Sequence, residues 1–172
     1  MARPSYLTRA VVCVVIGLVV ARLTSAWPKA FLAIAAEMAT AVGLVVSCCG
    51  IDVAVVANEI RSSTVVYVVS PVCVGVYGIA AGVGLVGAVR RRGWCWRLLG
   101  SLAVTATVLL VNVVRIATCV GSREQGGDPW FRAAHDGVWP FVDGGMLAIL
   151  FLWCARLDRR GVDVRNGAAR TT

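Results

Sequence analysis

Three side chains in this sequence have the chemistry of a nucleophilic enzyme site. They are the thiol of Cys73, the guanidinium of Arg115 and the imidazole of His135, which is the only histidine of the chain. A cysteine attacks as its thiolate, which a nearby cation or helix N-terminus favours. An imidazole can accept the thiol proton and return it to a leaving amine, and an arginine can stabilise an oxyanion while keeping its charge. The three groups therefore suit cleavage of a peptide bond by a cysteine nucleophile.

The elements that must position these groups are predicted to be membrane helices. Of the 172 residues, 59% are hydrophobic and the mean hydropathy is +0.81, whereas soluble domains average about 45–50% apolar residues. Five runs approach the roughly 20 apolar residues of a membrane helix: Ala10–Leu23, Ala30–Gly50, Val74–Val89, Leu98–Cys119 and Val138–Ala155. We expect an all-α integral membrane protein, a bundle of about five transmembrane helices. Residues 1–160 would form a single transmembrane catalytic domain and residues 161–172 a mobile basic cytoplasmic tail.

Arginine clusters predict the orientation, because basic residues gather in cytoplasmic loops. One cluster, residues 90–97, separates the third and fourth runs, and another begins at Arg156 after the fifth. Residues 51–72 and 120–137 should therefore face outward, and the N-terminus should be outside if all five runs span. The first run is the open case, since it is short and has basic residues on both sides. The net charge of +8 is expected to meet membrane lipid headgroups rather than nucleic acid.

The predicted outer segment between the second and third runs contains two β-branched stretches, Val53–Val56 and Thr64–Val69, around a polar turn. This pattern is typical of short strands and predicts an extracytoplasmic β-like hairpin on the membrane surface; a reentrant or spanning element is the alternative. The hairpin, including Tyr67, could pair with an extended peptide by strand addition.

The predicted topology brings the reactive groups to one membrane face. Cys73 begins the third helix at its outer end, and Arg115 lies within about one turn of the outer end of the fourth, with Asn112 on the same face. His135 lies in the outer loop before the fifth helix. An arginine at that depth needs a polar cavity or partner; Glu37, the obvious carboxylate, should lie deeper toward the inner side.

The sequence does not supply an obvious carboxylate to orient His135, and it does not single out one cysteine as the nucleophile. Asp136 is adjacent in sequence to His135, so we expect it to be poorly placed to orient the imidazole. Cysteine counting cannot single out Cys73, because most of the seven cysteines are expected to be inert. Cys119, which should also face outward, could form a disulfide with Cys48 or Cys49 in an oxidising compartment.

The order and spacing of these motifs resemble the exosortase/archaeosortase family of membrane transpeptidases over residues 51–153. The matching residues are the Cys-x-Gly of Cys73 and Gly75, the Asn-x-x-Arg-Ile of Asn112 to Ile116, and His135 before the following helix. Many members have a small polar residue where this chain has Val74, and often an acidic residue shortly before the cysteine, where this chain has Ser-Pro-Val. The chain also lacks several N-terminal helices of the common eight-helix members.

The resemblance implies a membrane cysteine protease and transpeptidase. Its partners would be exported proteins with a C-terminal sorting signal, which consists of a short motif, a hydrophobic helix and a basic cluster. The enzyme would cleave there and transfer the new carboxyl end to an acceptor. Cys73 would be the nucleophile, His135 the general base and acid, and Arg115 the group that holds the scissile carbonyl or its oxyanion. Asn112 and Gly75 match the family's motifs and are candidates for orienting the substrate.

The expected location is the cell (inner) membrane, in a multi-pass arrangement with the active site on the extracytoplasmic side and the C-terminus in the cytoplasm. We expect no cofactor, no metal and no nucleic-acid partner, because no ligand spacing or phosphate-binding loop is present. The rival interpretation is a small membrane protein without enzyme activity, such as a transporter subunit or scaffold. Its glycines and alanines at Gly78–Ala88 would then serve close helix packing, which is expected in either case.

Overall fold

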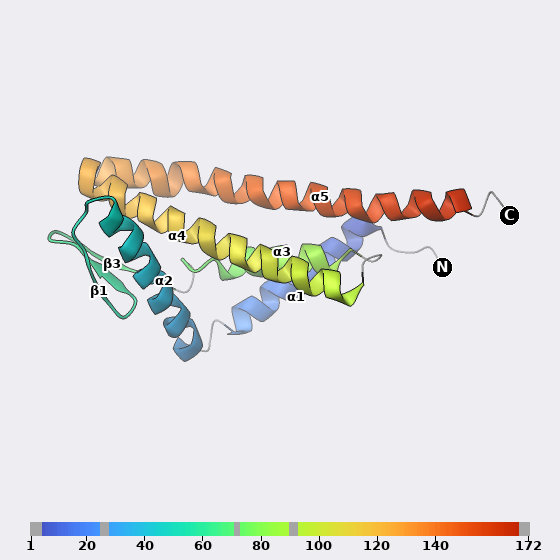
Figure 1. Cartoon of the computed structure of the whole chain (residues 1–172), viewed down its shortest axis with the longest axis horizontal. Helices are drawn as coiled ribbons and strands as arrows, with labels where there is room; N and C mark the ends of the chain where they lie inside the picture. Colours follow the sequence, from blue (N-terminus) through green and yellow to red (C-terminus); the bar gives the residue numbers. More distant parts are fainter. Residues whose placement is uncertain (1–4, 25–27, 71–72, 90–92, 169–172) are drawn as a thin grey trace.

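The computed structural model shows a mostly helical chain with one small sheet (Figure 1) and describes residues 5–24, 28–70, 73–89 and 93–168. The elements are α1 (Tyr6–Thr24), α2 (Pro28–Cys48), β1 (Ala54–Val56), β2 (Glu59–Arg61), β3 (Val66–Val68), α3 (Val76–Gly87), α4 (Trp94–Arg132), the π-helical turn η1 (Ala133–Val138) and α5 (Trp139–Ala168). Helices thus occupy the places of all five apolar runs. Most of the predicted C-terminal tail continues α5, and residues 169–172 lie outside the described part of the chain.

The region predicted as an outer loop, residues 120–137, is helical instead. Arginine, glutamate and glutamine are good helix formers, and they carry α4 beyond its apolar run. The helical backbone breaks at Gly127, whose φ of 72° and ψ of −163° are open to glycine without a side-chain clash. Past this kink the chain reverses, and α5 runs back beside α4 (Figure 1). His135 consequently lies on the helical turn η1 rather than on a loop.

Small residues let α3 pack closely between its neighbours, as the sequence predicts. A methyl group at Gly82 would collide with Val104 of α4, and one at Gly84 would come within 2.9 Å of the Cys13 carbonyl oxygen of α1. However, α3 has only 12 residues, which at 1.5 Å per residue is about 18 Å. This helix falls well short of a bilayer core of about 30 Å.

The start of α1 and the end of α5 lie at the same end of the molecule (Figure 1). Arg9, near the start of α1, pairs with Asp158 in the distal half of α5 at 2.7 Å, and the Tyr6 ring lies 5.7 Å from that of Phe151. This arrangement differs from five successive crossings with an external N-terminus, which would separate the two ends. Packing of α1 against α3 and the pair between Arg9 and Asp158 accompany this arrangement.

The sheet has three antiparallel strands in the order β1-β2-β3, one more than the predicted hairpin. The additional strand β2 arises from residues that the sequence predicts as a turn. Ile60 is fully buried against α2, while Glu59 and Arg61 on either side of it turn outward and form a 2.6 Å salt bridge. Gly43 allows α2 to pack closely against β1, because a methyl group at this position would collide with Val55.

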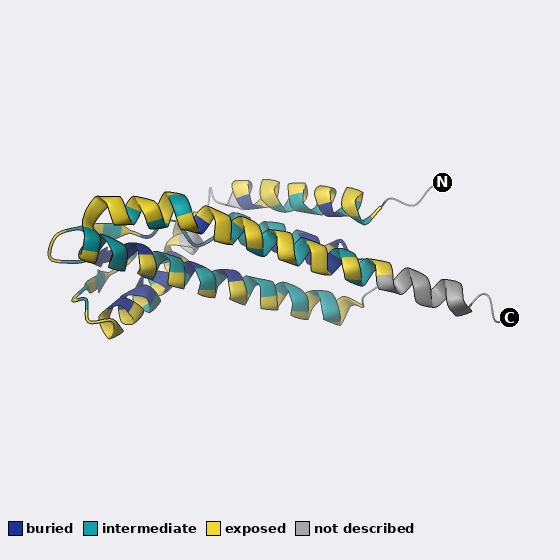
Figure 2. Cartoon of the chain, turned by 90° about the horizontal axis from the view of Figure 1, so that it is seen from above, coloured by how far each residue is buried: buried dark blue, intermediate teal, exposed yellow. Residues whose placement is uncertain are grey.

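Many large apolar side chains are exposed on the helices, whose exposed residues are yellow in Figure 2. On α1 the exposed side chains include Leu7, Val15 and Ile16, each more than half exposed. Among the described residues, the helical stretch Trp94–Arg159, which includes the kink at Gly127, is the one that contains an apolar segment long enough to cross a membrane. The helical segments Leu32–Cys48 and Val76–Gly87 are apolar but shorter. Only 22% of the apolar segment within Trp94–Arg159 is buried, unlike the core helix of a soluble protein. This exposed apolar surface favours association with a membrane.

Candidate functional site

Four of the predicted site residues line one cavity of about 250 Å³. Tyr67 comes from β3, Cys73 from the turn before α3, Arg115 from α4 and His135 from η1. The remaining wall is largely apolar and includes Ile116, Val120 and Phe131. A thiol, a guanidinium and an imidazole from three separate elements therefore face a common space, as the sequence predicts.

Cys73 lies in a turn that precedes α3 rather than inside the helix, which begins at Val76. Its backbone N–H donates to the Ser70 carbonyl oxygen at 2.9 Å, and its Sγ is 3.2 Å from the Ser70 hydroxyl. The side chain is half-buried at the cavity. Ser70 thus fixes both the backbone and the sulfur of the candidate nucleophile, a role that the sequence did not reveal.

Gly75 and Asn112 contact each other and are not among the residues that line the cavity. Gly75 has a φ of 80°, and any side chain there would collide with the Asn112 amide. Asn112 is buried and donates to the Val108 carbonyl oxygen of its own helix at 2.8 Å. This contact brings the first residues of α3 against α4 one turn before Arg115. The two motif residues therefore position Cys73 relative to Arg115.

Arg115 has its carboxylate partner on α5. Its Nη1 donates to Asp143 Oδ2 at 2.9 Å, with a quarter of the arginine side chain exposed. Glu37, the carboxylate that stood out in the sequence, is exposed on α2. A signal for Asp143 was present in the sequence, because it is a single acidic residue inside the apolar run 138–155. An intramembrane charge of either sign predicts a partner.

The imidazole of His135 is held on two sides. Its Nδ1 lies 2.7 Å from Asp136 Oδ1, and its ring stacks on Phe131 with centroids 5.4 Å apart. The expectation that Asp136 could not orient His135 is therefore wrong. Both side chains are largely exposed, at 45% and 69%, so they can bend toward each other even as sequence neighbours. With Nδ1 occupied, Nε2 is the nitrogen left to act on Cys73.

No hydrogen bond joins Cys73 to His135 within the described chain; the cavity lies between the groups. Catalytic hydrogen bonds are commonly long before a substrate binds. A space of about 250 Å³ can admit a few atoms of a peptide around a scissile bond. The geometry therefore suits closure of the hydrogen bond upon a bound substrate.

Strand β3 is fastened to α4 at the rim of the cavity. The Tyr67 hydroxyl donates to Glu124 Oε1 at 2.6 Å, and the Thr64 hydroxyl lies 3.4 Å from the other oxygen. The bond from Tyr67 lowers the pKa of Glu124, while burial and this carboxylate raise the pKa of Tyr67. Glu124 is thus kept charged and Tyr67 neutral, which favours a fixed phenol at the cavity rim.

The cysteines and the single histidine could in principle form disulfides or hold a metal ion. Across the described residues, no cluster of three histidine, cysteine or acidic side chains could hold a metal ion. All seven cysteines are free thiols, so neither disulfide suggested for Cys119 is formed. Cys119 is buried and lines the same cavity as Cys73, whereas Cys48 and Cys49 are exposed.

Compared with known proteins, the chain matches no family model, no curated protein and no solved structure. Its function must therefore be inferred from the residues of the site and their geometry.

Proposed function

We propose that this protein is a membrane cysteine protease and transpeptidase of the exosortase/archaeosortase type. It would cleave exported proteins at a C-terminal sorting signal and transfer the new carboxyl end to a surface acceptor. The observation that carries the proposal is the meeting of Cys73, Arg115 and His135 at one cavity. These residues come from elements far apart in the sequence and occur in the order of that family's motifs.

The proposed chemistry has two half-reactions. Nε2 of His135 accepts the proton of the Cys73 thiol, and the thiolate attacks the scissile carbonyl carbon. Arg115 donates to the resulting oxyanion, whose charge it balances in a partly dry cavity. When the tetrahedral intermediate collapses, His135 returns the proton to the leaving amine, and a thioester to Cys73 remains. The acceptor nucleophile then gives its proton to His135, attacks the thioester carbonyl and expels the Cys73 thiolate, which takes the proton back from His135.

Asp143 and Asp136 would support this chemistry without touching the substrate. Asp143 holds one nitrogen of Arg115, which leaves the other side of the guanidinium fork for the oxyanion. Asp136 would accept a hydrogen bond from the Nδ1–H group of His135 and so favour the tautomer with an unprotonated Nε2. Each carboxylate therefore serves one member of the proposed catalytic set.

The proposed setting is a multi-pass arrangement in the cell membrane, with α1, α3, α4 and α5 in the lipid. Their exposed apolar faces support this. The end that carries Arg9, Arg97 and Arg156 would be cytoplasmic, since basic residues remain there. The cavity would then lie near the outer face, where a sorting signal with a spanning helix presents its cleavage motif.

The open edge of β3 is the proposed guide for that motif. Among the described residues, the sheet order leaves β3 without a neighbouring strand on one side, and Tyr67, Val68 and Val69 line the cavity. An extended peptide can add to such an edge through backbone hydrogen bonds. It would then run along β3 toward Cys73.

The decisive test is cleavage of a co-expressed reporter that bears a candidate C-terminal sorting signal. We expect Cys73→Ala to abolish processing at normal membrane expression. Cys119→Ala is the matched control, because it removes a second thiol from the same cavity and should leave processing intact. Cleavage that persists without Cys73 would refute the catalytic assignment and favour a membrane protein without enzyme activity.

A further inference from the structure

A second cavity, of about 430 Å³, lies near the other end of the helices. Its polar wall consists of Thr8 and Arg9 of α1 and Arg97 of α4, and the end of α3 contributes Gly87 and Ala88. Arg97 precedes Arg115 by 18 residues of continuous helix, which corresponds to about 27 Å along α4. The cavity is therefore separate from the one that contains Cys73.

One buried nitrogen of Arg9 finds no hydrogen-bond acceptor in the part of the chain that the structure describes. The Arg9 side chain donates through Nη2 to Asp158 at 2.7 Å and through Nε to the Ser5 carbonyl oxygen at 3.3 Å. Its Nη1 is buried and has no hydrogen-bond partner among the described residues. A buried charged donor without an acceptor is costly, and such a group in a native structure commonly indicates an ion or ligand.

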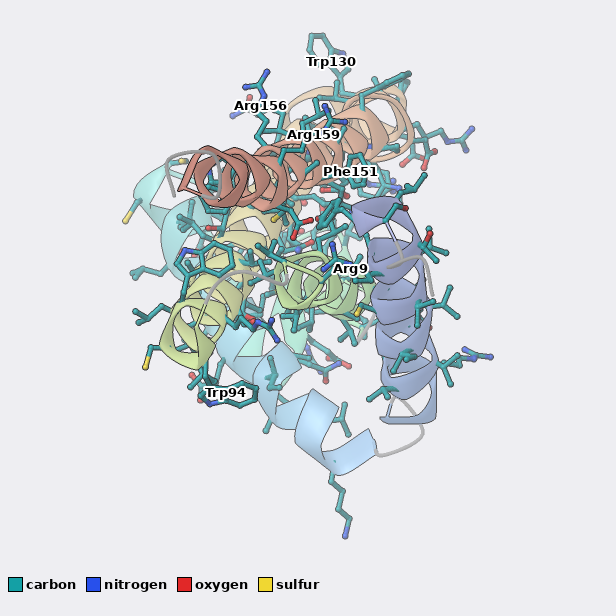
Figure 3. The ribbon with its side chains drawn as sticks, turned by 90° about the vertical axis from the view of Figure 1, so that its right-hand side faces the viewer. Arg9, Trp94, Trp130, Phe151, Arg156 and Arg159 are labelled. Carbon is teal, nitrogen blue, oxygen red and sulfur yellow. The ribbon has the colours of Figure 1, made fainter. Side chains whose placement is uncertain are left out.

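The charges around this cavity favour an anion. Two guanidinium groups line it, and Asp158, which partners Arg9, is not among the lining residues. Figure 3 shows Arg9 in the space between α1, α3 and α5, with Arg156 and Arg159 on α5 at the same end. Guanidinium forks bind phosphate oxygens through paired, charge-assisted hydrogen bonds. The polar part of the cavity therefore fits a phosphate group.

The other wall of the cavity is apolar and continues onto the outside of the protein. Val12 lines the cavity and is half exposed, and it adjoins the outward face of α1 that includes Val11, Val15 and Val19. Apart from the neighbouring backbone of α3, no heavy atom lies within 4 Å of the position that a Cβ atom at Gly87 would take, so the space beside it is open. A ligand that combines a phosphate with an apolar chain would match both walls, whereas a free phosphate would match only one.

We propose that this cavity binds the phosphate group of an anionic membrane lipid, whose acyl chains lie along the apolar face of α1. Basic pockets between membrane helices on the cytoplasmic side are suited to such headgroups. The lipid would give Arg9 its missing acceptor and join α1 to α4 through Arg97. The proposal depends on a membrane setting but not on protease activity.

The test uses the purified full-length protein in detergent, with phosphatidylglycerol as the anionic probe and phosphatidylcholine as the neutral one. Native mass spectrometry measures how much of each lipid is retained. We expect phosphatidylglycerol to be preferred and Arg97→Gln to weaken its binding about fivefold, as expected for one arginine near a headgroup. Arg156→Gln, an equal charge loss on an exposed residue at the same end, should change binding less than twofold.

Gly87→Leu provides a variant that keeps every charge. The added side chain would enter the open space and should also weaken binding at an unchanged midpoint of thermal unfolding. Equal losses for Arg97→Gln and Arg156→Gln, with no effect of Gly87→Leu, would overturn the proposal in favour of diffuse surface charge. Displacement of phosphatidylglycerol by a moderate concentration of inorganic phosphate would overturn the lipid as the ligand. Reporter cleavage in the same variants should persist, so failure of this proposal is distinguishable from failure of the proposed enzyme function.

Discussion

Replacement of Asp143 by asparagine tests whether Arg115 is held in place for chemistry. The substitution keeps the shape of the side chain but removes the charge that pairs with Arg115 at 2.9 Å. Exposed ion pairs contribute about 0–1 kcal/mol, while breaking a fully buried pair costs about 3–5 kcal/mol. With side chains 25% and 36% exposed, solvent screening places this pair toward the lower range. We expect a loss of about 1–2 kcal/mol in the free energy of unfolding.

The effect on cleavage should exceed the effect on folding. A guanidinium without Asp143 loses one of its orienting contacts, and small displacements of an oxyanion donor reduce rates strongly. We expect kcat for the reporter peptide to fall about tenfold, with a smaller change in KM, which corresponds to about 1.4 kcal/mol of transition-state stabilisation. The assay is cleavage by purified protein, with the midpoint of thermal unfolding measured in the same detergent.

Asp158→Asn is the matched control, because it removes the same charge from a second arginine–aspartate pair between helices. That pair is distant from the Cys73 cavity and less exposed, at 19% and 15%, so the loss of stability should be at least as large. Cleavage per folded molecule should nevertheless stay near the wild-type value. The reasoning would be refuted if Asp143→Asn were destabilised but cleaved at the normal rate. It would also be refuted if both variants lost activity equally.

Two further predictions concern β3. Tyr67→Phe should destabilise the protein near neutral pH, because the hydrogen bond from Tyr67 lowers the pKa of Glu124 and favours its charged form. This stabilisation is fully present above the pKa of Glu124 in the unfolded chain, about 4.3. It is lost as the pH falls through the lower pKa of Glu124 in the folded protein. The difference in thermal midpoint between wild type and variant should therefore shrink toward pH 3, and a constant difference would contradict the account. In addition, Val68→Pro should reduce reporter cleavage about fivefold, the effect of roughly one backbone hydrogen bond, whereas Val68→Ala should be harmless. The N–H of Val69 donates inward to Asn58, so by alternation that of Val68 faces the open edge; equal cleavage by the two variants would exclude strand addition there.

The sequence predicted where the reactive groups lie along the chain. The apolar runs predicted the helices, because a helix that lies in lipid or in a protein core needs a long stretch of apolar residues. The residues near their predicted outer ends, Cys73 and Arg115, accordingly share a cavity with His135. Strand β2 was missed because a three-residue strand between polar neighbours has only Ile60 to show its buried side. Such a short alternation cannot be distinguished from a turn without knowledge of α2.

The partners of the reactive groups were harder to predict. Whether Arg115 meets Glu37 or Asp143 depends on which helix lies beside α4, and apolar periodicity does not encode helix adjacency. The bond between Tyr67 and Glu124 joins residues 57 positions apart, so it depends on tertiary packing alone. Gly75 could be matched to a motif in the sequence. Why glycine is needed there is explained only by the structure, in which its φ is positive and a side chain would collide with Asn112. The reactive residues could thus be identified from short stretches of sequence, whereas their hydrogen-bond and ion-pair partners could be identified only from the fold.

The shortness of α3 has a consequence for how the proposed enzyme would sense its membrane. Cys73 is joined to this helix of about 18 Å, and Gly75 and Asn112 lock the start of the helix to α4. The depth of the thiol is therefore set by the protein and does not adjust when the surrounding lipid becomes thicker. Hydrophobic mismatch would have to be absorbed by the lipid, which must thin locally around α3. A bilayer of longer acyl chains would have to thin further around α3 for a peptide to reach the thiol, so access to Cys73 would depend on the chain length of the lipid.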